Sequence, residues 1–210
     1  MIFNTIVHYK KVTSTNSLLS KLVQGKNIDR NLVLVADYQT EGKGQREKKW
    51  HSVKNKNLLF SVYISPDDCF VNQKIYFNII TSLSIVYTLQ KYIKDSKIQI
   101  KWPNDIFVDN HKISGILIEP TVLKEKIKKV IIGVGININQ VRFPFTENNP
   151  TSIKKILKKE VDKQPVLMNF LHNFSQLFES FKEKKYEFLD QEYLSFLRDS
   201  AKFFKNRNAN

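Results

Sequence analysis

The chain has 210 residues, of which 41% are hydrophobic and 12% aromatic, so it is long and apolar enough for one folded domain rather than a disordered chain. Its formal net charge of +14 favours anionic partners such as nucleotide phosphates, nucleic acid, anionic lipid or an acidic protein, but its lysines are spread along the chain and do not by themselves indicate DNA binding. No apolar run has the length of a membrane span, and the N-terminus lacks the layout of a signal peptide. The single cysteine, Cys69, excludes an internal disulfide framework and favours a cytoplasmic location.

The first two thirds of the chain are predicted to be rich in strands. We expect strands over residues 2–9, 31–40, 57–65, 97–101 and 130–138, and helices ending at Gly25 and spanning 72–94. A hairpin is expected around residues 109–111, because two apolar runs flank an Asp-Asn-His sequence there. Residues 121–129 are predicted to form a solvated connection.

The last third has a helical pattern. One apolar face predicts a helix that Pro165 would start; it contains Phe170, Leu171, Phe174, Leu177, Phe178 and Phe181. A second helix is expected near 187–197, followed by a polar tail over 198–210. Strands followed by helices predict the α+β class.

A basic, glycine-containing segment, GKGQREKKW, spans residues 42–50. Gly42 and Gly44 allow the backbone to approach a ligand, the cations suit a phosphate-bearing substrate, and Trp50 offers a stacking face. The segment is not a Walker loop. A solvated surface loop is the alternative interpretation.

Three later segments also favour a nucleotide site. KWPND (101–105) offers oxygen ligands for Mg²⁺ at Asn104 and Asp105, although an Asn-Asp turn is an equally simple explanation. HKISGILIE (111–119) places Lys112 beside Gly115, where a cation next to bare backbone suits an anion; the alternative is a lysine facing solvent. GVGININ (133–139) indicates either close approach to a ligand or tight strand packing.

Taken together and in order, these segments closely resemble the catalytic domain of biotin protein ligases. The resemblance covers nearly the whole chain and includes STN (14–16), DYQTEGKGQREKKW (37–50), NLLFS (57–61), KWPNDI (101–106), HKISGILIE and GVGININ. It implies a mixed β-sheet backed by helices, related to class II aminoacyl-tRNA synthetases and lipoate ligases. It also implies a catalytic domain over residues 1–197. As departures from relatives, we expect no DNA-binding domain before the first strand, and a C-terminal β-barrel that is either absent or truncated.

The resemblance implies a two-step reaction. Biotin and Mg·ATP give biotinyl-5′-AMP, and the biotinyl group then passes to one lysine of the biotin carboxyl carrier domain of a carboxylase such as acetyl-CoA carboxylase. The implied catalytic cations are Lys112, Lys43 and Lys101, and the implied biotin contacts are Ser14, Thr15, Asn16, Gln39, Gly42, Lys43, Lys112, Gly115, Gly133 and Gly135. The implied contacts with ATP or the adenylate are Gln45, Arg46, Lys48, Trp50, Asn104, Asp105 and Asn137, with Asn104 and Asp105 near Mg²⁺. A homodimer is a further expectation.

The basic loop departs from the family pattern. Lys43 and Gln45 stand where arginines are usual, and Glu47 stands where a glycine is usual. Loss of guanidinium groups and gain of an anion predict weaker retention of the adenylate. A lipoate or octanoate ligase of the same fold, a basic nucleic-acid-binding protein and a biotin-binding protein without turnover are the alternative functions.

Overall fold

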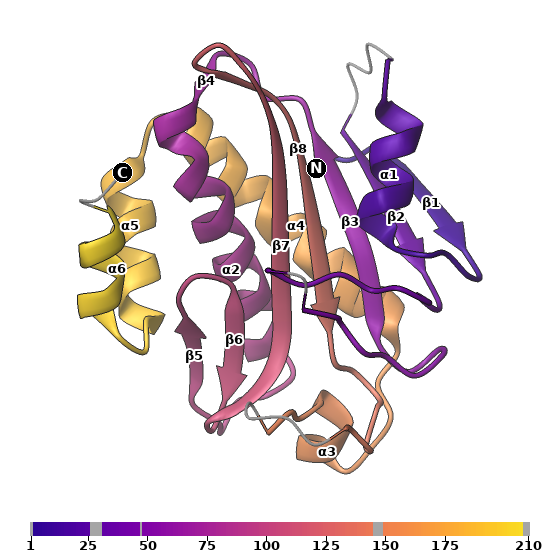
Figure 1. Ribbon diagram of the computed structural model, residues 1–210. Helices are drawn as coiled ribbons and strands as arrows, with labels where there is room; N and C mark the ends of the chain where they lie inside the picture. Colours follow the sequence, from indigo (N-terminus) through magenta and orange to yellow (C-terminus); the bar gives the residue numbers. More distant parts are fainter. Residues whose placement is uncertain (1, 26–30, 47, 145–148, 208–210) are drawn as a thin grey trace.

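The apolar runs of the first two thirds form one mixed sheet in the computed structural model, which describes residues 2–25, 31–46, 48–144 and 149–207 (Figure 1). The strands are β1 (Thr5–Tyr9), β2 (Leu32–Ala36), β3 (Leu58–Ile64), β4 (Cys69–Phe70), β5 (Ile98–Lys101), β6 (Asp105–Val108), β7 (His111–Leu123) and β8 (Lys126–Ile136). They are ordered β1-β2-β3-β8-β7-β6-β5, with the short β4 beside β8. Only the β1–β2 pair is parallel among these described pairings.

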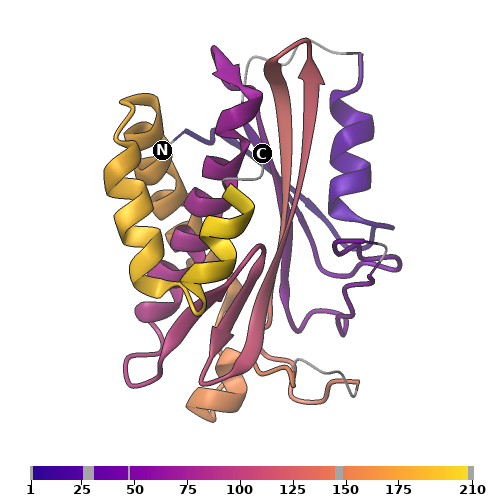
Figure 2. The ribbon, with the colours of Figure 1, turned by 60° about the vertical axis from the view of Figure 1, so that its left-hand side comes forward.

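Helices cover the two faces of this sheet unequally. The helices are α1 (Thr15–Val23), α2 (Lys74–Gln90), α3 (Ile153–Leu157), α4 (Lys163–Lys182), α5 (Tyr186–Phe196) and α6 (Ser200–Arg207), with a 3₁₀ turn, η1 (Val71–Gln73), before α2. The sheet lies between α1 on one side and the layer of α2, α4, α5 and α6 on the other (Figure 2). Among the described residues, no helix is both long and apolar enough to cross a lipid bilayer.

Strand alternation divides the buried side chains between two clusters. Ile132 and Val134 of β8 belong to the large core under α2 and α4, whereas Ile131 packs with Leu19 and Tyr63 in the small cluster under α1. The α1 cluster covers only part of its face, which leaves the rest of that face for a site. Cys69 lies in the large core, and burial raises the pKa of its thiol to about 11, consistent with a structural thiol.

The predicted α+β class and the mixed sheet backed by helices are confirmed. The hairpin predicted around residues 109–111 is also confirmed, because Asp109 and Asn110 both have positive φ and connect β6 to β7. The first strand begins later than predicted, at Thr5, since the backbone N–H of Ile2 donates to the Ser175 hydroxyl instead.

Residues 121–129 are not the solvated connection that we predicted. β7 and β8 continue through them as a long hairpin, in which Thr121 pairs with Lys129 and Val122 with Ile127. The turn is made by Lys124, at φ 56°, and Glu125. Many side chains here are exposed, so the hydropathy pattern is that of a loop, even though the two strands pair on both sides of a register shift between Thr121 and Val122.

The predicted start of the long helix and the predicted polar tail also need correction. Asp162 caps α4 by accepting from Gln164 N at 3.0 Å, so Pro165 lies within the first turn, where its missing N–H leaves no helical bond unmade. Residues 200–207 form α6, and Phe203 of this helix is fully buried. Its ring lies 5.3 Å from that of Tyr193 and 5.3 Å from that of Trp102.

Candidate active site

A cavity of about 640 Å³ opens on the sheet face that carries α1. Its floor is a glycine-rich part of β7 and β8, where Gly115 pairs with Gly135 and Leu117 pairs with Gly133. Of the predicted site residues, those that line the cavity are Ser14, Thr15, Asn16, Gln39, Lys43, Gln45, Arg46, Lys48, Trp50, Lys101, Asn104, Asp105, Lys112, Gly115, Gly133, Gly135 and Asn137. The structure therefore brings together segments that are far apart in the sequence, while their roles in binding remain predictions.

One end of the cavity is a buried, uncharged polar cluster at the start of α1. Gln39 Oε1 accepts from the backbone N–H of Thr15 at 2.7 Å and from its hydroxyl at 3.0 Å. The Ser61 hydroxyl, on β3, lies 2.7 Å from Thr15 Oγ1 and 2.5 Å from Asn16 Oδ1. Ser14 caps α1, its side chain accepting from Ser17 N. These bonds fix the side chains before a ligand arrives.

Asn16 is held from three directions. Besides its bond with Ser61, its Nδ2 donates to Glu119 Oε2 at 2.7 Å and to the carbonyl of Leu117 at 3.4 Å. A Cβ on Gly133 would lie only 2.3 Å from Asn16 Oδ1, so this position on β8 requires glycine. Ser61 and Glu119 were not predicted as site residues. Both lie in motifs quoted above, and the alternation of β7 puts Glu119 on the face of Gly115 and Leu117.

The indole of Trp50 lies against the glycine pair of the floor. A Cβ on Gly135 would be 2.5 Å from Trp50 Cε2, and one on Gly115 would be 2.8 Å from Trp50 Cζ3. The Nε1 of Trp50 is buried and has no hydrogen-bond partner among the described residues. A donor buried in this way is costly unless a ligand or water satisfies it. Side chains at either glycine would displace the ring.

Gly42 supports this arrangement from outside the cavity lining. Its carbonyl accepts from Trp50 N at 2.8 Å, and a Cβ there would meet the Trp50 carbonyl oxygen at 2.5 Å. Of the predicted site residues, it alone is absent from the cavity lining. The structure therefore places Gly42 behind the cavity lining, where it holds Trp50 in position, and its contact with a ligand stays a prediction.

The basic segment folds back on itself between Gly42 and Trp50. The backbones of Lys43 and Lys49 form an antiparallel β-bridge, and Gly44 N donates to the Lys48 carbonyl at 2.6 Å. Arg46 has φ 51°, in the left-handed region, at the tip of this turn. The four cations of the turn, Lys43, Arg46, Lys48 and Lys49, are all exposed. Glu47, on which the prediction of weaker adenylate retention partly depends, lies outside the described residues.

Lys112 and Asp105 form the charged centre of the opposite end. Lys112 Nζ lies 2.5 Å from Asp105 Oδ1, and only 19% and 15% of the two side chains are exposed. Lys112 Nζ also lies 5.6 Å from the centre of the Trp50 ring. The alternative of a lysine facing solvent is therefore wrong. Asn104 is fixed beside this pair, because its Nδ2 donates to the Ile116 carbonyl at 3.1 Å and its own carbonyl accepts from Ile116 N.

The donor set at this end fits Mg²⁺ only when phosphates supply further ligands. Among the described residues, no group of three or more His, Cys, Asp or Glu side chains is placed to hold a metal ion. Mg²⁺ bound together with nucleotide phosphates usually takes only one or two carboxylates from the protein. Among the residues that the structure describes, Asp105 Oδ1 is buried with no partner beyond Lys112, and Asn104 offers its Oδ1, so these residues meet that requirement.

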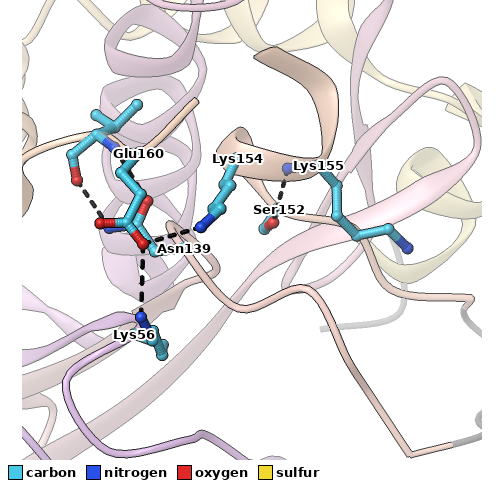
Figure 3. A network of polar contacts seen from close by, with 7 residues as sticks. Lys56, Asn139, Ser152, Lys154, Lys155 and Glu160 are labelled. Carbon is cyan, nitrogen blue, oxygen red and sulfur yellow. Dashed lines mark hydrogen bonds and ion pairs between the residues drawn. The ribbon is translucent and has the colours of Figure 1, made fainter. Parts of the chain in front are cut away.

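The segment after β8 closes the cavity beyond Lys112. The Thr151 carbonyl accepts from Asn137 Nδ2 at 3.0 Å, and Thr151 N donates to the carbonyl of Lys112 at 2.9 Å. Farther along, Asn139 makes two hydrogen bonds with the backbone of Val161, while Ser152 accepts from Lys155 N at the start of α3 (Figure 3).

An exposed network of ion pairs connects this segment to Lys56, which lies between Trp50 and β3. Glu160 lies 2.8 Å from Lys154 and 3.5 Å from Lys56, and Lys56 accepts from Asn139 N through its carbonyl (Figure 3). The hydrogen bond from Lys154 holds the pKa of Glu160 below its usual value. Cavity residues that were assigned no role from the sequence include His51, Leu117, Val134, Phe143, Pro144 and Pro150. These residues are common strand or loop residues, and no feature of the sequence around them distinguishes them as site residues.

Comparison with known proteins identifies the family. Residues 9–137, more than half of the chain, match the model of the biotin/lipoate A/B protein ligase family. The chain belongs to this family. As a family member it has the biotin–lipoate ligase fold, and the biotin protein ligase from Aquifex aeolicus in complex with biotin and ATP superimposes with a TM-score of 0.78 at 29% identity, over 93% of this chain and 79% of that one.

Curated relatives agree with this assignment. The bifunctional ligase/repressor BirA of Bacillus spizizenii is 29% identical over 178 residues, which is 82% of this chain and 54% of that protein. The biotin–[acetyl-CoA-carboxylase] ligase of Mycobacterium tuberculosis is 29% identical over 130 residues, 60% of this chain and 47% of that protein. The chain thus spans about half the length of the curated relatives that it matches.

Proposed function

We propose that this protein is an ATP-dependent biotin ligase that forms biotinyl-5′-AMP and transfers the biotinyl group to a lysine of a biotin carboxyl carrier domain. One observation carries the proposal: a single cavity joins a neutral polar end, at Thr15, Asn16 and Gln39, to a cationic end at Lys112 across a flat glycine floor. Biotin has this polarity, with an uncharged ureido ring at one end and a carboxylate at the other. The relatives named as biotin ligases support the choice of acid.

In the first step, a carboxylate oxygen of biotin attacks the α-phosphorus of ATP. The new bond is the P–O bond of the mixed anhydride, and the bond to the β-phosphate oxygen breaks to release pyrophosphate. Two anions must approach each other, and charge builds on the phosphoryl oxygens. Lys112 is the cation best placed to offset that charge, because it is largely withdrawn from water and oriented by Asp105.

In the second step, the amine of the carrier lysine attacks the carbonyl carbon of the adenylate. The amide C–N bond forms, the anhydride C–O bond breaks, AMP leaves, and the amine gives up its proton. Lys112 would stabilise the carbonyl oxygen and the departing phosphate, and the exposed cations of the turn, Lys43 and Arg46, would retain AMP until the attack. The pathway requires no nucleophile from the protein.

Mg²⁺ is part of this proposal as the partner of ATP. Asp105 and Asn104 would hold it together with the phosphates, and when bound it supplies positive charge beside the phosphoryl group. Biotin carboxyl carrier protein is the proposed partner, supported by the name of the mycobacterial relative. Location in the cytoplasm and a homodimer stay predictions from the sequence.

Transfer to a carrier distinguishes this function from lipoate or octanoate ligation on the same fold. The protein would be incubated with Mg·ATP, a recombinant biotin carboxyl carrier domain and each of the three acids, and acylation of the carrier followed by intact mass. We expect the carrier to gain biotin alone. Replacement of the acceptor lysine in the carrier should abolish the gain. Acylation by lipoate or octanoate instead of biotin would refute the proposal.

A further inference from the structure

The connection between α5 and α6 runs beside the edge strand of the sheet. Leu197 bridges to Ile100 of β5 in parallel, and Arg198 N donates to the Ile100 carbonyl at 2.9 Å. Partners in a parallel bridge point to the same face, and the following residues, Lys101 and Arg198, point to the other. Ile100 is fully buried in the core, so Lys101 and Arg198 stand on the opposite face, the one that carries the cavity.

Lys101 and Arg198 share one aromatic ring on this face. Lys101 Nζ and the guanidinium carbon of Arg198 each lie 5.5 Å from the centre of the Phe107 ring. The two charges are therefore separated by no more than twice that distance. Phe107 lies opposite Gln99 of β5 and is only 3% exposed, although it belongs to neither core cluster. Contact with the ring restricts the conformations of both cationic side chains.

These two cations have no ionic partner in the part of the chain that the structure describes. Asp105 is the acidic residue opposite Lys101 in the strand register, but its carboxylate is paired with Lys112. Lys101 lines the cavity, and Arg198 extends the positive charge beyond its lining. Two like charges on one ring repel each other, and no anion of the described residues is paired with either, so the arrangement favours an anionic group that spans both.

We propose that Arg198, together with Lys101, forms a subsite for the terminal phosphates of ATP and for the pyrophosphate that leaves. The α-phosphate belongs near Lys112, as argued above, and the remaining two phosphates would continue along the same face towards Lys101 and Arg198. Guanidinium groups bind phosphates through paired hydrogen bonds, and Phe107 orients this one. This inference deepens the proposed adenylating activity and rests on it.

Kinetics of pyrophosphate exchange into ATP would test the subsite. For Arg198→Gln we expect KM for ATP and for pyrophosphate to rise roughly three- to tenfold, the usual scale for one partly solvated charge contact, with KM for biotin unchanged. Phe107→Leu keeps the apolar cover but removes the ring, and should shift both constants in the same direction by less. The control is Lys74→Gln, which also removes one positive charge. Lys74 is exposed at the start of α2, so all three constants should be unchanged in this variant.

Direct binding separates failure of the subsite from failure of the proposed activity. Calorimetric titration with inorganic tripolyphosphate requires no turnover, and Arg198→Gln should bind it more weakly than the wild type does, while binding of AMP is unchanged. Equal binding of tripolyphosphate by the two proteins would overturn the inference, whether or not the wild type exchanges pyrophosphate. So would a defect confined to transfer from preformed adenylate to the carrier, because Arg198 would then contact an acidic carrier surface. The wild type could fail to exchange pyrophosphate into ATP while it still binds tripolyphosphate more tightly than Arg198→Gln does. That result would contradict the proposed adenylating activity and leave the phosphate subsite supported.

Discussion

Lys112 and Asp105 meet across β6 and β7 in an ion pair of 2.5 Å, with most of both side chains withdrawn from water. Asp105 is the last residue of the KWPND segment, all five residues of which line the cavity, and Lys112 is on β7, which also carries Gly115 of the floor. A cation fixed in this way needs little reorganisation when negative charge develops beside it, which is the condition for electrostatic catalysis.

Replacement of Lys112 by Ala should therefore lower the rate of adenylate formation by about 10²–10³-fold, the usual effect of removing one preorganised charge. Single-turnover formation of biotinyl-AMP would measure this. Lys126→Ala is the control, since Lys126 and Asp68 form an ion pair of the same length at the exposed hairpin end of the sheet. Near-normal adenylate formation by the Lys112 variant would refute the assignment.

Because the Trp50 ring lies directly on Gly135, we expect Gly135→Ala to displace the ring. The new Cβ would lie 2.5 Å from the indole, so the ring must move, and the part of the cavity that we propose binds biotin must change shape. We expect tryptophan fluorescence of the free protein to change and biotin affinity to fall at least tenfold, a loss of about 1.4 kcal/mol. Gly25→Ala is the control: no atom of the described residues lies within 4 Å of the added Cβ, and the φ of +68° predicts lower stability with normal biotin binding. Unchanged affinity in Gly135→Ala would contradict the placement of the biotin site.

Glu119 is expected to act as a positioning residue through Asn16. Loss of its carboxylate in Glu119→Ala removes the acceptor for Asn16 Nδ2 at 2.7 Å and allows the amide to rotate. KM for biotin should rise while kcat in pyrophosphate exchange changes little, and Glu119→Gln, which keeps an acceptor oxygen, should recover most of the loss. Glu125→Ala, in the hairpin turn, should behave as the wild type. An equal loss in kcat and kcat/KM would indicate instead a role in the transition state.

The helix α6 should contribute to the stability of the whole domain. Phe203 is fully buried against Trp102 and Tyr193, so Phe203→Ala should lower the free energy of unfolding by about 3–5 kcal/mol, as for other buried phenylalanines. The neighbouring Phe204 is 45% exposed, and Phe204→Ala should cost much less. Urea denaturation of both variants would measure the difference. Equal stability of the two would show that α6 does not pack as described.

The sequence was sufficient to predict the elements whose own patterns are strong. Continuous apolar runs predicted the strands β2, β3 and β8, and the phenylalanine face predicted α4. The resemblance predicted which ordered motifs share one site, and residues of the STN, basic-loop, KWPND, HKISGILIE and GVGININ motifs line one cavity although these motifs lie in a helix start, loops and strands. Gly133 and Gly135 were interpreted as a sign of either close approach to a ligand or tight strand packing, and the atoms that lie closest to them in the structure are those of the Asn16 and Trp50 side chains.

Features that depend on pairing between distant segments could not be predicted in this way. The outer part of the β7–β8 hairpin has many exposed side chains, and its strands are defined by backbone pairing with each other and with the short β4. Phe203 and Phe204 are adjacent in a short, mostly polar stretch, and which of the two is buried depends on the space beside Trp102 and Tyr193. Arg198 is held beside β5 by the bridge between Leu197 and Ile100 and by its own backbone bond to Ile100, and no local sequence pattern marks it.

The most direct test of this account is exchange of labelled pyrophosphate into ATP, measured with biotin, lipoate, octanoate and no acid. We predict exchange with biotin alone, strict dependence on Mg²⁺, and loss of exchange in Lys112→Ala. Exchange driven by lipoate or octanoate would assign the cavity to a different acid. Absence of exchange with every acid, in a protein that still binds biotin, would contradict the central claim that this cavity forms an adenylate.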